Sequence, residues 1–284
     1  MWVTAALLAV IVLVGAVLSA AAFGEWRWTR ATERSRARLL AQAGAGGAPY
    51  SGRDLEGLPS PVARFFRRVL REGQPIVRSA RVVWEGEFNM GKPGRDNWRP
   101  FVATQDFVPG APGFVWNARI QMLPLVPVLV RDSLVHGHAA MQGAALGLIT
   151  VVDVSGTDTL AAGALQRYLG EAVWFPTALL PRQGVSWTAL DDARAVATVS
   201  AGPTTVSLEF RFDADGHPVS VFAPDRPYDD GRGAPVPRPW EASNRRFDTR
   251  NGVIVPVESD VEWQLPEGRF SYWRGRPVRI TYES

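Results

Sequence analysis

The side chains best suited to metal chemistry lie in one short stretch. His136-Gly137-His138 supplies two imidazoles, and Asp132 adds a carboxylate, a donor set that binds transition metals. If these residues form one strand, their side chains share a face, because alternate residues of a strand point the same way. A short His-x-His with no further His nearby is also typical of ordinary half-exposed strand residues. We therefore keep these three as metal candidates and predict no cofactor.

Acidic side chains supply the candidates for acid–base chemistry. Glu171 follows Arg167 by four residues on an otherwise apolar helix, a spacing that allows an ion pair on the polar strip of that helix. Alternatively, Glu171 lines the mouth of a cavity together with Trp174. Asp191-Asp192 is more typical of a turn, because adjacent strand residues point to opposite faces. The chain has no Cys, no Ser–His–Asp order and no nucleotide-binding glycine motif.

A central helix is predicted for residues 158–174, and it positions most of these candidates. Apolar side chains cover most of its circumference, which is typical of a helix that is buried or roofed over. Pro176 cannot continue the helical hydrogen bonds, so a bulky apolar loop follows Trp174. We predict a ligand pocket under this helix, lined by Tyr168, Glu171, Trp174, Phe175 and, from a neighbouring strand, Trp116.

The rest of the chain favours strands. Most of residues 77–154 and 186–283 is strand-like, with broad alternation at 77–89, imperfect alternation at 113–122, and turn signals at 91–97, 213–217 and 250–252. Residues 224–239 are rich in Pro, Gly and Asp and predict a long surface loop. The predicted fold class is α+β, with a strongly curved, half-barrel-like antiparallel sheet packed on the central helix. The eleven Trp either fill the core of such a sheet or line a cavity in it.

Residues 2–23 predict a membrane-spanning helix, because they carry no charge and are long enough to cross a bilayer. A cleavable signal peptide is the alternative, since residues 20–22 are all Ala. No Lys or Arg precedes the run, which favours an uncleaved single-pass anchor. We expect residues 1–24 to form the anchor, 25–57 a basic juxtamembrane segment and linker, and 58–284 a single β-rich domain.

Basic charge gathers next to this anchor. Residues 24–82 contain twelve Arg against five acidic residues, whereas the remainder of the chain has a small acidic excess. The positive-inside rule then favours the cytoplasmic side of a bacterial cell membrane for the domain, with Trp26 and Trp28 at the membrane interface. A basic amphipathic helix at residues 61–72 either packs on the sheet or lies on the membrane surface. No basic stripe interleaves with aromatic residues, so nucleic acid is not a predicted partner.

Several blocks resemble an uncharacterised bacterial family whose members have an N-terminal membrane segment and a domain of unknown function. They are LPSPVARFFRRVLREGQP, WRPFVATQDFV, PGFVWNARIQMLP, LGEAVWFPTALLP, VSLEFRFDADG and YWRG, from about residue 55 to the C-terminus. The resemblance implies no catalytic residues. The order of elements also resembles the half-barrel of bacterial lipoprotein carriers, which hold acyl chains under a helical lid.

These features favour a membrane-anchored binding module for a lipid or another apolar ligand. One alternative is a scaffold whose Trp-rich face docks a membrane protein. The other is a hydrolase that uses Glu171, Asp153 or the set of Asp132, His136 and His138, which would require those groups to meet in one cleft. An enzyme is the less favoured class.

Overall fold

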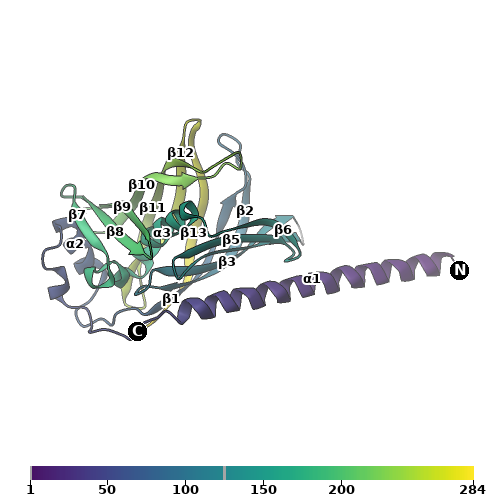
Figure 1. The fold of residues 1–284 in the computed structure, drawn as a ribbon, viewed down its shortest axis with the longest axis horizontal. Helices are drawn as coiled ribbons and strands as arrows, with labels where there is room; N and C mark the ends of the chain where they lie inside the picture. The colour runs from purple at the N-terminus through teal and green to yellow at the C-terminus, as the bar shows by residue number, and fades with distance from the viewer. Residues whose placement is uncertain (1, 124–125) are drawn as a thin grey trace.

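A strongly curved antiparallel sheet forms the body of the protein in the computed structural model, which describes residues 2–123 and 126–284 (Figure 1). The sheet has thirteen strands in the order β6-β5-β4-β3-β2-β1-β13-β12-β11-β10-β9-β8-β7 and is not closed. The predicted fold class is therefore confirmed. The strands are β1 (Ser79–Asn89), β2 (Trp98–Val108), β3 (Gly113–Leu123), β4 (Val126–Val135), β5 (His138–Ala145), β6 (Ile149–Ser155), β7 (Ser186–Ala189), β8 (Arg194–Ala201), β9 (Thr204–Phe212), β10 (Pro218–Tyr228), β11 (Val236–Arg250), β12 (Val253–Leu265) and β13 (Gly268–Glu283).

The sheet departs from the sequence prediction at two places. Residues 224–239 are not one long loop, because β10 runs to Tyr228 and β11 begins at Val236. His136 and Gly137 do not lie within a strand: they form the two-residue turn between β4 and β5, with φ of 53° and 75°. Two positive φ angles give a turn whose twist matches that of the flanking strands.

The central helix α3 (Asp158–Glu171) lies on the concave face of the sheet, and a 3₁₀ turn at Ala172–Trp174 extends it to the predicted end. The Thr157 hydroxyl accepts a hydrogen bond from the Leu160 amide at 3.2 Å and so caps the first turn. Gly170 packs on the sheet, where a Cβ built on it would make ordinary van der Waals contact, 3.6 Å from side-chain atoms of Leu208, Val221 and Trp240. Further 3₁₀ turns follow at Pro176–Leu179 and Pro181–Gln183.

Helix α2 (Ser60–Val69) packs its apolar face on the sheet, where Phe65 and Phe66 are fully buried. Its N-cap is Pro59, and the helix ends three residues before Glu72, the predicted end. Figure 1 places α2 at the opposite end of the body from residues 2–23. This position does not favour contact of α2 with the bilayer that α1 would cross.

Helix α1 (Trp2–Leu40) is longer than the predicted anchor, and its second half packs on the convex face of β2, β3 and β4. The Trp28 indole donates to the Asn117 side chain at 2.8 Å, and the Arg131 guanidinium lies 4.7 Å from the Trp28 ring. Trp28 is thus part of the contact with the body rather than a membrane anchor. Trp26 remains exposed and stacks on Phe23.

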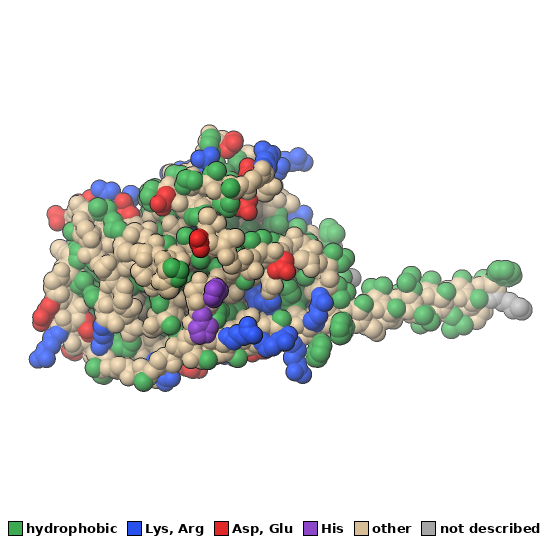
Figure 2. Space-filling model, in the orientation of Figure 1, with side chains coloured by type: hydrophobic (Ala, Val, Ile, Leu, Met, Phe, Trp, Pro, Cys, Tyr) green, Lys and Arg blue, Asp and Glu red, His purple; other side chains and the backbone are tan. Residues whose placement is uncertain are grey.

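The first half of α1 extends away from the body as a helix long and apolar enough to cross a membrane. Figure 2 shows hydrophobic side chains along this extension, with Lys and Arg side chains gathered where it meets the body. The junction is tight, because Gly24 contacts the β5–β6 turn at Gly147 and the Arg27 guanidinium donates to the Gly147 carbonyl at 3.0 Å. Because α1 is continuous and docked, the body has a fixed direction relative to this helix.

Candidate functional site

A cluster of charged side chains lies between the C-terminal half of α3 and the concave face of the sheet. Arg167 of α3 bridges two carboxylates: its Nη1 lies 2.7 Å from Asp132 Oδ2 on β4, and its Nε lies 2.9 Å from Glu171 Oε1. Gln105 on β2 donates to the other Glu171 oxygen at 2.7 Å and accepts from the Trp84 indole at 3.1 Å. We call Gln105, Asp132, Arg167 and Glu171 the polar cluster.

The polar cluster is only just reachable by solvent. The side chains of Arg167, Glu171 and Asp132 are 18%, 17% and 9% exposed, respectively. Burial raises the pKa of Glu171 above its usual value, although Arg167 and Gln105 act in the opposite direction. One cation thus balances two carboxylates in a poorly hydrated place, an arrangement that rarely adds to stability and suggests a role in recognition.

Half-buried aromatic rings continue from this cluster along the concave face. We call these residues the aromatic strip: Phe88, Tyr228, Trp240, Trp263, Tyr272 and Trp273. Trp240 packs beside Gly170 of α3 and donates to the Tyr272 hydroxyl at 3.0 Å. Trp263 lies 4.9 Å from Tyr228 and 6.1 Å from Tyr272, measured between ring centroids. Apart from Trp240, the rings of the strip are only partly covered, so they offer apolar surface that the rest of the chain leaves open.

Two β-bulges set the orientation of side chains along the strip. The register between β10 and β11 shifts after Ala223, so that Ala223 faces Trp240 and Arg226 faces Arg238. Without the extra residue, Arg226 would point to the convex face. A second shift between β12 and β13 makes Tyr272 the unpaired residue next to Trp273. Bulges of this kind re-aim side chains, and here they add one cation and one hydroxyl to the concave face.

Arg226 is a cation without a carboxylate partner among the described residues. Its guanidinium carbon lies 4.7 Å from the Trp240 ring and 5.8 Å from the Trp263 ring. Its Nη1 is buried without a hydrogen bond in the described part of the chain. Burial lowers the pKa of Arg226, and the charge of Arg167 acts in the same direction, whereas Tyr272, Asp132 and Glu171 act against this shift. A buried guanidinium that has an unpaired N–H group and no contacting carboxylate favours the binding of an anion.

The structure divides the predicted ligand-binding residues into two groups. Glu171 and Trp116 meet at the polar cluster, because the Arg167 guanidinium lies 5.0 Å from the Trp116 ring. Tyr168, Trp174 and Phe175 are packed in the core under the helix instead. The Tyr168 hydroxyl donates to the Pro109 carbonyl at 3.3 Å. The Phe175 ring lies 4.4 Å from the Phe107 ring.

Trp174 in particular has its polar and apolar contacts filled by protein atoms. Its indole donates to the Pro256 carbonyl at 2.9 Å, and its ring meets Trp84 edge-on at 4.6 Å. Its carbonyl accepts from the Tyr282 hydroxyl at 2.6 Å. These contacts are typical of a core residue, and a ligand pocket beside Trp174 stays a prediction.

The metal candidates do not share a site. Asp132 is committed to Arg167 inside the concave face, whereas His136 lies in an exposed turn and His138 begins β5. Over residues 2–123 and 126–284, the one group of three donors close enough for an ion is Asp213, Asp215 and His217, which are turn residues. The His217 ring is already hydrogen-bonded to Asp213 and Arg68.

Of the candidate catalytic carboxylates, Asp132 and Glu171 meet through Arg167 in the polar cluster, whereas Asp153 lies apart from them. Asp153 accepts from Gln142 at 3.0 Å, and Gln142 in turn bonds Arg131, which contacts α1 on the convex face. Glu171 lies on the concave face, on the other side of the sheet. Asp153 therefore shares no cleft with Asp132 and Glu171, and those two carboxylates contact the Arg167 guanidinium, so we do not propose catalysis by this set.

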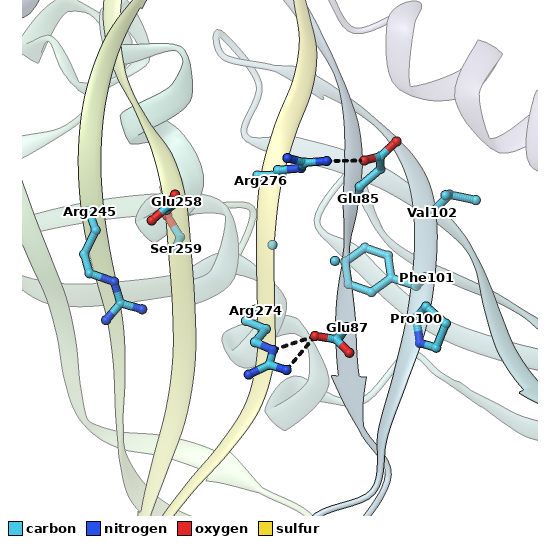
Figure 3. A pocket seen from close by; sticks show the side chains of 12 residues that line it. Glu85, Glu87, Pro100, Phe101, Val102, Arg245, Glu258, Ser259, Arg274 and Arg276 are labelled. Carbon is cyan, nitrogen blue, oxygen red and sulfur yellow. Dashed lines mark hydrogen bonds and ion pairs between the residues drawn. The ribbon is translucent and has the colours of Figure 1, made fainter.

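Two larger cavities open on the surface. One, of about 580 Å³, lies at the hairpin ends and is lined by Lys92, Tyr228, Arg232, Arg238 and Leu265, among others. Tyr228 also belongs to the aromatic strip, and its ring contacts that of Trp263 at 4.9 Å, so this mouth borders the strip. The other is a groove of about 570 Å³, shown in Figure 3. There Glu85 pairs with Arg276 and Glu87 pairs with Arg274, so the charges of that groove compensate one another.

Sequence reasoning missed Arg226 and the aromatic strip as a unit. Residues 224–239 look like a loop because of their Pro and Gly content, and no pattern in the sequence reveals a bulge. The spacing of Arg167 and Glu171 indicated half of the polar cluster. The sequence does not show that Asp132 lies beside Arg167 and Glu171, because this contact depends on the pairing of β4 with β3 beneath α3.

Comparison with known proteins identifies relatives of the chain but no activity. A family model described as a family of unknown function, DUF6544, matches residues 48–275. No curated protein matches the chain. Among solved structures, it is similar to a LolA superfamily protein from Nitrosomonas europaea, with 9% identity, a TM-score of 0.37, and coverage of 79% of this chain and 93% of that chain. It is also similar to a beta-barrel-like protein of domain of unknown function DUF1849 from Brucella abortus, with 9% identity, a TM-score of 0.23, and coverage of 74% and 99%.

Proposed function

The chain belongs to the DUF6544 family of unknown function, as its motifs predicted, and we propose that it is a membrane-anchored module that binds a lipid or another apolar ligand. The observation that carries the proposal is the aromatic strip. Its rings extend along the concave face from Trp240, which packs beside α3, and all of them except Trp240 stay partly uncovered. Concave apolar surfaces with a few fixed polar groups are the usual form of a small-molecule site.

The direction of α1 supports a ligand that comes from the membrane. Residues 2–23 continue without a break into the docked half of α1, and the β5–β6 turn touches Gly24 at the point where the helix leaves the body. Strand β6, an edge of the sheet, exposes 68% of Ile149 and 59% of Val151 next to this point. A bilayer crossed by α1 would cover this apolar edge. The open side of the sheet would then lie close to the lipid head groups.

The side of the membrane follows from charge. Arg27, Arg30 and Arg34 come directly after the apolar half of α1. By the positive-inside rule, the domain faces the cytoplasm. Uncleaved, the helix anchors the protein as a single-pass membrane protein.

The proposal is tested by photo-cross-linking on the full chain in phosphatidylcholine nanodiscs. The probe is a phosphatidylcholine with a photoactivatable group near the end of one acyl chain, and mass spectrometry locates the labelled peptides. We expect labels both on residues 2–23 and on the aromatic strip. Trp263→Glu, which puts a charge among the rings, should remove the second set and keep the first.

Val278→Glu is the matched control, because Val278 is 51% exposed on β13 and lies outside the strip. It should keep both sets of labels. Labels confined to α1 and β6 in the unaltered protein would refute ligand binding on the concave face. That result would favour the second function, docking of a membrane partner, for which the exposed apolar edge of β6 is the supporting observation.

A further inference from the structure

We infer that the ligand carries an anionic head group, a phosphate or a carboxylate, which Arg226 binds while the apolar tail lies along the aromatic strip. This inference rests on the proposed function and names the class of ligand. Its starting point is the difference between Arg226 and the other buried cation of the concave face. Arg167 has two carboxylates within 2.9 Å, whereas Arg226 has none among the described residues.

A β-bulge and two aromatic rings fix the position of the Arg226 side chain. The bulge after Ala223 turns its side chain to the concave face, and the rings of Trp240 and Trp263 hold the guanidinium. Stacking on aromatic faces fixes the plane of an Arg side chain but leaves its N–H groups unused. The buried Nη1 has no hydrogen-bond partner in the described residues, so it still has donors for an incoming oxygen.

The neighbouring carboxylates act on Arg226 only from a distance, and none of them contacts its guanidinium in the described residues. Asp132 and Glu171 are both directed at Arg167, and the Glu171 oxygen that does not bond Arg167 accepts from Gln105. Neither carboxylate neutralises Arg226 by direct contact. A phosphate or carboxylate that approached Arg226 would form a charge-assisted hydrogen bond where little water competes, which is the strong kind.

The apolar part of the ligand follows from what surrounds Arg226. Trp240, Trp263 and Tyr272 form a continuous surface next to the guanidinium, and Tyr228 connects this surface to the mouth between the hairpin ends. A small inorganic anion would leave that surface uncovered. An amphiphile with an anionic head covers both the cation and the rings, so a membrane lipid fits better than a free phosphate.

The experiment uses the full chain in phosphatidylcholine nanodiscs with two photoactivatable probes of equal acyl length: phosphatidic acid, which has a phosphate head, and diacylglycerol, which has none. We expect phosphatidic acid to label the aromatic strip about tenfold more than diacylglycerol, since a hydrogen bond to a charged group has about that effect. Arg226→Gln should bring phosphatidic acid down to the level of diacylglycerol and leave diacylglycerol labelling unchanged. Arg211→Gln, on the opposite face of β9, should keep the full preference.

The outcomes separate the two proposals. If neither probe labels the strip in the unaltered protein, the proposed function fails, and the inference about the head group fails with it. If both probes label it equally, or if Arg226→Gln keeps the preference, ligand binding stands and the role of Arg226 is refuted. Inorganic phosphate at millimolar concentration should not reduce the labelling. If it does, the site takes a free anion, and the amphiphile is the wrong class.

Discussion

Replacement of Arg167 by Met tests whether its charge is what allows the Asp132 and Glu171 carboxylates to be buried in the polar cluster. In the unaltered protein, Arg167 contacts Asp132 at 2.7 Å and Glu171 at 2.9 Å, and all three side chains are less than one-fifth exposed. Removal of the cation leaves two buried carboxylates without a counter-charge. Such a change costs about 3–5 kcal/mol of the free energy of unfolding. Met keeps most of the volume of the Arg stem, so a cavity contributes little.

The stability lost in the Arg167→Met variant should increase as the pH rises. Burial already raises the pKa of Glu171 above its usual 4.5, and Arg167 acts against this rise. Without Arg167 the pKa of the folded state rises further, whereas that of the unfolded chain does not change. The folded variant then binds the Glu171 proton more tightly than the unfolded chain does. The stability that this proton contributes is therefore fully present below pH 4.5 and is lost as the pH rises towards the folded-state pKa of Glu171. We expect a loss of about 1.4 kcal/mol per pH unit across that window.

The assay is urea unfolding of the full chain in detergent, followed by Trp fluorescence at pH 5 and at pH 8. The neutral variant with Asp132→Asn, Arg167→Met and Glu171→Gln is the control, because it removes all three charges and keeps an acceptor for Gln105. It should be more stable than the single variant at pH 8 and nearly independent of pH in this range. A cost below 1 kcal/mol for Arg167→Met, or an equal cost at the two pH values, would refute the reasoning.

Two further predictions concern the core under α3 and the junction of α1. Trp174→Ala should lower the free energy of unfolding by about 3–5 kcal/mol, because the indole packs on Trp84 and donates to the Pro256 carbonyl. Lipid labelling of the aromatic strip should persist in the folded fraction of this variant. Loss of that labelling without destabilisation would show that Trp174 belongs to the binding site. Gly24→Val should destabilise the docking of α1 by about 1–3 kcal/mol, because a Cβ there would lie 2.4 Å from the Leu146 carbonyl oxygen. Hydrogen exchange of residues 25–40 measures this effect, and Gly15→Val, which has no atom within 4 Å of its Cβ, should change nothing.

The sequence determined the local elements and their general arrangement. An uncharged run at residues 2–23 requires a helix that avoids water. Alternation with turn signals requires antiparallel strands, and a helix apolar around most of its circumference must lie inside the sheet that those strands form. The pairing of Arg167 with Glu171 also followed from spacing, because residues four apart on a helix are neighbours.

Only the tertiary structure decided which side chains share a site. Asp132 lies 35 positions before Arg167 and reaches it because β4 passes under α3. Trp174 and Phe175 follow Glu171 closely in the chain, but their side chains pack in the core instead. The orientation of Arg226 depends on one extra residue in β10, and a shift of one residue moves a strand's side chains to the other face. Registers and bulges are set by the packing of all the strands together, so they leave no signal in any short stretch of the sequence. The docking of α1 beyond residue 23 likewise depends on its contacts with Asn117 and Gly147, which are distant in the chain and meet α1 only in the fold.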